Sequence, residues 1–373
     1  MSLAKKIILC VLSFVTIAVA GVTVYGVKVY KDAEKSLDKT YVPVSKSVSK
    51  TNSEALKATK PISILLMGID TGAVGREETW DGRSDSMMVV TVNPVKKTTT
   101  VVSLERDILV DIIGPADNKY NGIDDKLNHS YSYGGEDMTI ATIEQLLDIK
   151  LNYFAKVNMQ GLSDLIDAVG GIDVNNKLGE FTVEDGPYGS TTVPAGKIHL
   201  NGETGLAYAR MRHEDPTGDI GRQKRQREVV ELIARKLLSV DGFSQYQKVL
   251  KAIEKNMKTN IPLNDIKLLA QSYRDAFDKV ENVQLQGIGT EISGVSFQIL
   301  PQAELLEVQN IIKTQLDLPT SEYLNGNQIT YESQYGYSPD GSTGYTTTDD
   351  STSLATADGY DTTPTNYDNN EDE

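Results

Sequence analysis

The chain has 373 residues, 39% of them hydrophobic, and a formal net charge of −15 from 37 Lys and Arg against 52 Asp and Glu. This length allows one large domain or two small ones, and the apolar fraction is sufficient for a core. The acidic balance argues against a nucleic-acid partner, because binding a phosphate backbone requires a basic surface. With one cysteine and three histidines, neither a disulfide framework nor a multi-histidine zinc site is expected.

The N-terminus carries an uncharged apolar run between basic flanks. Lys5 and Lys6 precede residues 7–27, and Lys28 follows them. Since about 20 apolar residues span a bilayer, we expect residues 7–27 to be a transmembrane signal anchor. The positive-inside rule then places residues 1–6 in the cytoplasm and the rest of the chain outside, as a single-pass type II protein of the cell membrane. A cleaved signal peptide is the alternative, because residues 18–20 read Ala-Val-Ala.

A polar stretch and then a folded domain follow the anchor. Residues 28–59 are rich in Lys, Ser and Thr and are expected to form an extracellular stalk. Residues 60–319 mix short β-rich runs with apolar stripes of helical spacing, which indicates one α/β domain. Strands are expected at 62–66, 86–93 and 98–107. Helices are expected at 136–148, 159–171, 221–238, 244–257, 264–277 and 302–315.

The composition changes from Asn325. Residues 331–373 contain no Lys, Arg, Ile or Val and are rich in Ser, Thr, Gly, Asp and Tyr. Such a segment cannot bury enough apolar surface to offset the entropy lost on ordering. We therefore expect residues 325–373 to be a disordered acidic tail.

Residues 209–228 gather arginines in this acidic chain. Arg210 and Arg212 are two apart in a run, residues 205–212, that we expect to be extended, so their side chains would point the same way. Arg222 lies in the first turn of the next predicted helix, on the same face as Gln226, where free N–H groups favour an anion. Guanidinium groups bind phosphate oxygens well. The alternative is surface ion pairing of the segment's arginines with Asp215, Asp219 and Glu228.

Carboxylates and one more arginine lie near other predicted strand ends. Asp70 ends the first strand, Asp85 begins the second, and Arg106 ends the third. Carboxylates without histidine or cysteine suit a hard cation, which takes one or two of them together with substrate phosphates. We expect Mg²⁺ there, with Mn²⁺ as the second choice.

The sequence resembles the LytR–CpsA–Psr family of Gram-positive cell-envelope proteins. The resemblance rests on "LLMGID", "GRSDSMMVVTVNP", "VSLERDI", "DKLNHSYSYGG", "DAVGGIDV" and "AGKIHLNGETGLAYARMRHEDPTGDIGRQKRQ", in that order. It covers residues 60–319, and the short N-terminal end with a single anchor is also similar. The resemblance implies an α/β/α sandwich with a central mixed sheet and a deep apolar groove for a polyprenyl chain. Candidate lining lies in residues 159–170 and 229–238.

The resemblance also implies an activity. Family members are understood to transfer a glycopolymer, such as wall teichoic acid or capsular polysaccharide, from an undecaprenyl-pyrophosphate carrier to N-acetylmuramic acid of peptidoglycan. Undecaprenyl phosphate is released. On this sequence, Asp70 and Asp85 would hold Mg²⁺. The other implied site residues are Arg106, Arg210, Arg212 and Arg222 on the pyrophosphate, Arg83 orienting Asp85, and Gln226 bonding the head group.

Two other functions use the same residues. The chain could be a membrane receptor or regulator that binds the lipid-linked intermediate, although residues 1–6 are too few for a signalling domain. It could also be a pyrophosphatase-type hydrolase, with water in place of the sugar hydroxyl. In a transferase, Asp85 and Arg106 would be the catalytic pair.

Overall fold

The computed structural model describes residues 46–71, 80–186, 189–238, 254–326 and 328–339, with scattered positions between 31 and 43 and at 249 and 252. Within these residues, no helix combines the length and the apolar character needed to cross a bilayer. The expected anchor, residues 7–27, lies outside the described part of the chain.

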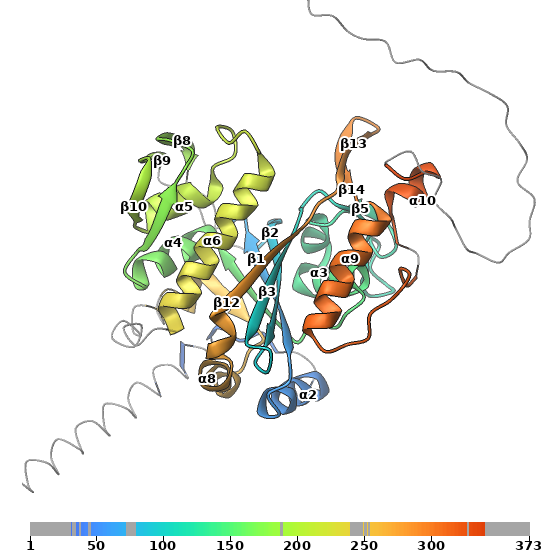
Figure 1. Ribbon diagram of the computed structural model, residues 1–373, viewed down its shortest axis with the longest axis horizontal. Coiled ribbons are helices and arrows are strands. Elements are labelled where there is room, and N and C mark those ends of the chain that lie inside the picture. The colour runs from blue at the N-terminus through green and yellow to red at the C-terminus, as the bar shows by residue number, and fades with distance from the viewer. Residues whose placement is uncertain are drawn as a thin grey trace, which may run out of the picture.

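A six-stranded sheet lies at the centre of the molecule (Figure 1). Its order is β11-β6-β1-β2-β3-β12, with β1 and β6 parallel, β3 and β12 parallel, and the other neighbours antiparallel. The expected central mixed sheet is therefore confirmed. The strands are β1 (Ile62–Ile69), β2 (Ser84–Asn93), β3 (Thr98–Leu104), β6 (Tyr153–Asn158), β11 (Met257–Thr259) and β12 (Lys279–Leu285).

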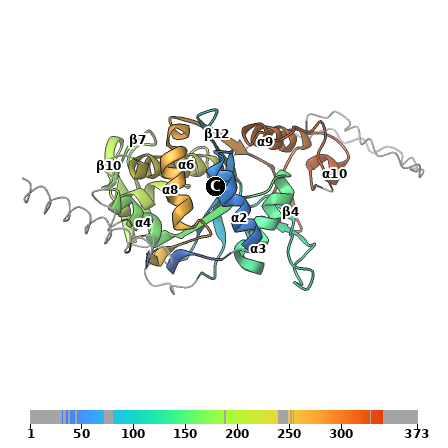
Figure 2. The same ribbon diagram turned by 90° about the horizontal axis from the view of Figure 1, so that it is seen from below.

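Helices cover both faces of this sheet (Figures 1 and 2). On one face, α3 (His129–Leu147) and α9 (Gln302–Gln315) pack on the apolar side chains of β1, β2 and β3. On the other face lie α6 (Asp219–Leu238) and α8 (Leu263–Ser272), followed by the 3₁₀ helix Arg274–Phe277. Burial on both faces explains why β2 reads as an almost continuous apolar run, and not as an alternating one.

A smaller layer packs on the outer side of α6. It contains α4 (Met159–Ala168), α5 (Gly202–Arg210) and two pairs of antiparallel strands. These elements share a second apolar cluster with α6. The paired strands are β7 (Ile172–Asn176) with β10 (Gly196–Leu200), and β8 (Phe181–Gly186) with β9 (Gly189–Val193). At the other end of the molecule lie β4 (Leu109–Asp111), β5 (Asp124–Lys126), β13 (Ile288–Ile292) and β14 (Val295–Ile299).

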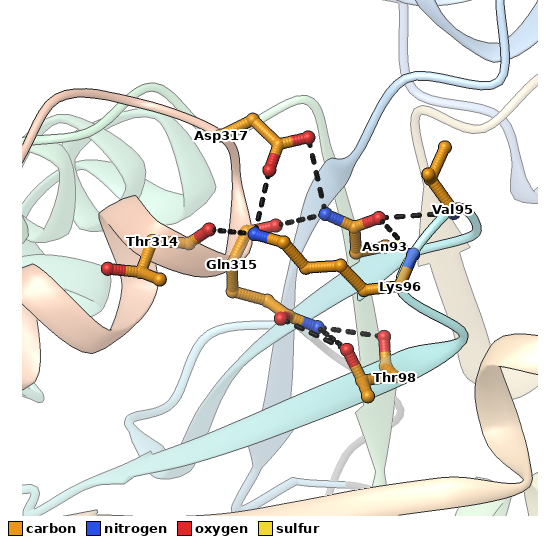
Figure 3. A network of polar contacts seen from close by, with 7 residues as sticks. All are labelled: Asn93, Val95, Lys96, Thr98, Thr314, Gln315 and Asp317. Atoms are coloured by element: carbon orange, nitrogen blue, oxygen red, sulfur yellow. Dashed lines mark hydrogen bonds and ion pairs between the residues drawn. The ribbon is translucent and has the colours of Figure 1, made fainter.

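The turn between β2 and β3 is tied to the end of α9 (Figure 3). Asn93 Nδ2 donates to the Gln315 carbonyl at 2.8 Å, and Gln315 Nε2 donates to the Thr98 carbonyl at 2.8 Å. Lys96 pairs with Asp317 at 2.7 Å. These bonds fix the end of α9 to the turn between β2 and β3. This turn lies at the end of the sheet that is away from the arginine-bearing end of α6.

Two segments expected to be unstructured are partly folded. Within the expected stalk, α2 (Lys46–Lys57) buries Leu56 beside β1, and Tyr41 bridges to Thr259 of β11. Within the expected tail, α10 (Tyr331–Tyr335) has a capping box, and its buried Glu332 accepts from the Gln302 backbone N–H at 2.7 Å. These parts of the expected stalk and tail are ordered because tertiary contacts stabilise segments whose composition alone does not.

Two predicted elements also differ. Residues 205–212 are not extended, since α5 runs to Arg210. An Asn201–Thr204 capping box begins this helix, and its apolar side chains are buried, so the local signals favour helix over strand. The helix expected at 244–257 lies largely outside the described residues, and its last residue, Met257, belongs to β11.

Candidate active site

A β-bulge places Asp85 near the start of β2, at one end of the strands of the central sheet. Gly68 pairs with Ser86 and Ile69 pairs with Ser84, so Asp85 is the extra residue between them. Bulges of this kind redirect side chains and are frequent beside active sites. Asp70, the residue after β1, accepts from the Arg83 backbone N–H at 2.8 Å and donates its own N–H to the Arg83 carbonyl at 3.1 Å. The ends of β1 and β2 thus bring the two carboxylates to one place.

Asp85 is held on both carboxylate oxygens. Arg106 Nη1 donates to Oδ2 at 2.9 Å, and Asn128 Nδ2 donates to Oδ1 at 3.1 Å. Arg106 also lies 3.4 Å from Asp107 through its Nε. Burial opposes the charge of Arg106, but the carboxylates of Asp85 and Asp107 outweigh it, so the pKa of Arg106 lies above its ordinary value.

That Arg83 orients Asp85 stays a prediction. The Arg83 backbone contacts Asp70, while the two carboxylate oxygens of Asp85 accept from Arg106 and Asn128. Asn128 is therefore a site residue that the sequence reasoning missed. A single Asn ahead of a helix carries no distinguishing signal in the sequence, and only the packing of α3 beside β2 reveals its role.

Arg222 stands in the first turn of α6, as expected. It pairs with Asp219 at 2.6 Å. The pKa of Arg222 lies below its ordinary value, because burial and the nearby charges of Arg106 and Arg212 outweigh the carboxylates of Asp219 and Asp85. Several cations are thus close enough to repel one another.

Besides Arg106 Nε, which lies 3.4 Å from Asp107 Oδ2, two guanidinium nitrogens at this site are buried without a hydrogen-bond partner among the described residues. They are Arg210 Nη1 and Arg222 Nε. A buried donor left unpaired costs about 1–3 kcal/mol, and more when it is charged. An anion with several oxygens is the ligand that would satisfy both, so the geometry favours anion binding over simple ion pairing.

Ion pairs with two of the expected carboxylates do form in this segment, Arg222 with Asp219 and Arg225 with Asp215, but the second pair is buried and not on the surface. Arg225 is buried against Asp215, and Arg227 donates to Ser103 Oγ at 2.6 Å beneath α6. Gln226 accepts from Ser86 Oγ at 3.0 Å and faces the site with Arg222. The helix period thus separates Arg222 and Gln226 from two arginines that serve the fold.

A cavity of about 1550 Å³ connects these groups to an apolar interior. Seven of the eight predicted site residues line it, and Arg83 is the exception. The seven are Asp70, Asp85, Arg106, Arg210, Arg212, Arg222 and Gln226. The apolar lining comes from β1, β2, α4, α6 and α8, and includes Ile64, Leu66, Met88, Leu162, Leu165, Val230, Ile233, Leu237 and Leu269.

The predicted groove lining was right for one side of each helix only. Leu162 and Leu165 of α4, and Val230 and Ile233 of α6, line the cavity. Their neighbours Ile166 and Val229 lie fully buried in the cluster between α4, α5 and α6. A helix between two layers must be apolar on both sides, so periodicity alone cannot separate core from cavity.

The donor set for a cation is small. Within the described ranges, no three His, Cys, Asp or Glu side chains gather as a metal site. Asp70 and Asp85 line the same cavity, and Mg²⁺ accepts as few as one or two carboxylates when phosphate oxygens supply further ligands. The two aspartates therefore fit a cation that arrives with, or is completed by, a phosphate ligand.

These features define an α/β protein with one large cavity that is apolar inside and carries arginines and two aspartates at its polar end. A profile of the LytR_cpsA_psr family matches residues 23–314. The chain belongs to the LytR–CpsA–Psr family.

Individual relatives agree with this assignment. The "Polyisoprenyl-teichoic acid--peptidoglycan teichoic acid transferase TagU" of Enterococcus faecalis is 46% identical over 317 residues, which cover 85% of this chain and 99% of that protein. The crystal structure of protein gbs0355 from Streptococcus agalactiae matches with a TM-score of 0.71 and 45% identity, over 76% of this chain and 97% of that one. The structure of TagT bound to LIIa-WTA matches with a TM-score of 0.57 and 30% identity, over 69% and 92%.

Proposed function

We propose that this protein transfers a glycopolymer, together with its phosphate, from an undecaprenyl-pyrophosphate carrier to N-acetylmuramic acid of peptidoglycan. The glycopolymer class is teichoic acid, as in the name of the Enterococcus faecalis relative. A sugar hydroxyl oxygen attacks the glycan-side phosphorus, and the phosphoanhydride bond to the lipid-side phosphate breaks. A phosphodiester forms, undecaprenyl phosphate leaves, and the hydroxyl proton is released.

One observation carries this proposal. A single cavity joins a long apolar interior to a mouth with arginines and two aspartates. A polyprenyl pyrophosphate has the same division, with a hydrocarbon chain on one side and several negative charges on the other. A water-soluble phosphate ester would leave the apolar part of the cavity without a matching group.

The proposed residue roles follow from the geometry. Arg106 bonds a phosphate oxygen on the side of Asp85, while Arg210, Arg212 and Arg222 bond the others, which stabilises charge in the transition state. Both oxygens of Asp85 accept hydrogen bonds, so Asp85 is poorly placed as a general base until Arg106 turns toward a phosphate. Gln226 bonds the head group.

Mg²⁺ is the cofactor we propose, held by Asp70 and Asp85. When bound, such a cation neutralises phosphate charge. Arg106 would then exchange its Asp85 contact for a phosphate oxygen.

We also propose that residues 7–27 anchor the protein in the cell membrane, with the catalytic domain outside. A lipid-linked donor and a cell-wall acceptor meet on that side of the membrane. Protease treatment of intact cells tests this placement. Digestion of residues 46–339 supports an external domain, whereas full protection would contradict it.

Product analysis tests the activity. The full-length chain in detergent would receive Mg²⁺, a synthetic polyprenyl-pyrophosphate glycan and uncrosslinked peptidoglycan, and mass spectrometry would search for a phosphodiester-linked glycan on muramic acid. Linked product supports the transferase. Free glycan phosphate without linked product would indicate a hydrolase, and bound donor without either product would indicate a receptor.

A further inference from the structure

Arg225 is a buried arginine that braces the end of α5. Its side chain lies outside the cavity lining, and the residue is only 6% exposed. Its Nε donates to the Tyr208 carbonyl at 3.0 Å, and its Nη2 donates to the Met211 carbonyl. The last carbonyls of a helix have no intrahelical donor, so Arg225 supplies two that α5 itself lacks.

The third donor of Arg225 reaches the loop between α5 and α6. Nη1 contacts Asp215 Oδ2, and Asp215 is 8% exposed. Asp215 Oδ1 accepts from the backbone N–H and the hydroxyl of Thr217, at 2.8 and 2.6 Å. A Cβ on Gly221 would overlap the Asp215 carboxylate, so a glycine is required where the loop enters α6. One buried pair therefore ties together the end of α5, the loop and the start of α6.

The cavity arginines are the immediate neighbours of these tied residues. Arg210 and Arg212 flank Met211, whose carbonyl Arg225 holds, and Arg222 follows Gly221. We infer that Arg225 and Asp215 are positioning residues of the anion site, which keep Arg210 and Arg212 close to Arg222 in the absence of a ligand. That the anion is a lipid pyrophosphate rests on the proposed function.

The physical reason is repulsion between like charges. Arg106, Arg210, Arg212 and Arg222 line one cavity. Burial lowers the pKa of Arg222 most, and the charges of Arg106 and Arg212 lower it further, against the carboxylates of Asp219 and Asp85. Without the contacts of Arg225 and Asp215, α5 and α6 would reduce this repulsion by moving apart at their shared junction. Arg225 adds no net charge to this junction, because Asp215 neutralises it; hydrogen bonds from Thr217 and Arg225 outweigh burial and hold the pKa of Asp215 below its ordinary value. The Arg225–Asp215 pair thus positions the cavity arginines without adding net charge to the junction.

A pair of probes separates positioning from general stability. Farnesyl pyrophosphate and farnesol share a hydrocarbon chain, and only the first carries the anion. Affinity for both would be measured on the full-length chain, on Arg225→Lys and on Asp215→Asn. Arg227→Lys is the matched control, because Arg227 is a buried arginine of the same helix that bonds Ser103 and Gln284, away from the cavity mouth.

The expected result is selective. Arg225→Lys and Asp215→Asn should weaken farnesyl pyrophosphate binding by about tenfold or more, while farnesol affinity stays within about twofold. Arg227→Lys should change neither. Equal loss of both probes in the brace variants, or unchanged pyrophosphate binding, would overturn the inference. If Arg225→Lys does not fold, Asp215→Asn decides alone.

The parent protein tests the underlying function in the same experiment. A parent that binds farnesyl pyrophosphate no better than farnesol would refute the lipid-pyrophosphate site itself, whatever the variants do. Preference in the parent with no selective loss in the variants would refute only the brace.

Discussion

At the scale of single residues, the site is a set of charges that restrain one another. Asp85 pairs with Arg106, Asp219 pairs with Arg222, and each of these arginines keeps one buried nitrogen without a hydrogen-bond partner among the described residues. Opposite charges in contact keep long side chains in one geometry before any ligand binds, which lowers the ordering that binding requires. An alanine at one of these positions removes a charge and also frees its partner.

Arg106→Ala should lower transfer activity by about 10³-fold, because a guanidinium that contacts phosphoryl charge in the transition state contributes on this order. The rate of linked-product formation is the measurement. Arg235→Ala is the control on α6, where the exposed Arg235 pairs with Glu231 and lies outside the cavity lining. A loss in the control equal to that in Arg106→Ala would contradict the assignment.

Glu105, the neighbour of Arg106, predicts a pH dependence of stability. It is 5% exposed and accepts from the Gly287 N–H at 3.2 Å. Burial, with smaller effects of Asp219 and Asp107, raises the pKa of Glu105 from 4.5 to about 7. A carboxyl with a higher pKa in the folded chain stabilises the fold at low pH, and this contribution is lost as pH rises from 4.5 to about 7.

Glu105→Gln should remove that contribution. Urea unfolding of parent and variant would be measured at several pH values. From pH 4.5 to about 7, the free energy of unfolding of the parent should fall relative to that of the variant. Above this window, the difference between the two free energies should be constant. Equal pH profiles for the two proteins would mean that Glu105 titrates normally.

At the scale of elements, the junction of α5 and α6 decides where the arginines lie. The extended run expected at 205–212 would have placed Arg210 and Arg212 by strand alternation. In the structure, Arg210 ends a helix and Arg212 follows an extended C-cap, Met211. The end of the helix, and not strand alternation, therefore places the two arginines. Both arginines line the cavity, and the prediction was right about their side for a wrong structural reason.

The last helix predicts the effect of C-terminal truncation. Deleting residues 328–373 removes α10 and its bonds to Leu300 and Gln302, and should lower the thermal unfolding midpoint by several degrees, since about 1 kcal/mol shifts it by a few degrees in a domain of this size. Deleting only residues 340–373 should leave the midpoint unchanged. A similar loss in both truncations would show that residues 340–373 contribute to stability.

At the scale of the whole molecule, the cavity lies between the layers. The sheet supplies one wall through β1 and β2, and α4, α6 and α8 supply the others. No single element contains it. Its polar mouth forms where the ends of β1, β3 and α5 meet the start of β2 and the first turn of α6.

Narrowing the cavity should therefore penalise long lipid chains selectively. Ala234 lines it from α6, and Ala234→Trp should weaken binding of a long polyprenyl pyrophosphate more than binding of a short prenyl pyrophosphate. Arg235→Trp adds the same ring on the exposed side of α6 and should affect neither ligand. Calorimetric affinities for both lengths provide the test, and equal weakening of both would place the hydrocarbon elsewhere.

The sequence by itself determined the chemistry of this protein and the order of its main elements. Strands 62–69, 84–93 and 98–104 and the helices α3, α4, α6 and α9 follow from local periodicity, which is set by neighbouring residues. Residue types also determined the positive charges of residues 209–228, because a guanidinium group stays protonated in proteins. These properties are local, so they can be read along the chain.

Only the tertiary structure decided which charged groups meet. It assigned Asn128 to Asp85, separated Arg225 and Arg227 from the cavity arginines, and folded parts of the expected stalk and tail onto the domain. Asp85 and Asn128 are 43 positions apart in the chain, and such contacts depend on how layers pack and on a one-residue bulge in β2. Packing between distant segments leaves no periodic signal in either one, which is why the sequence could name the residues of the site but not their partners.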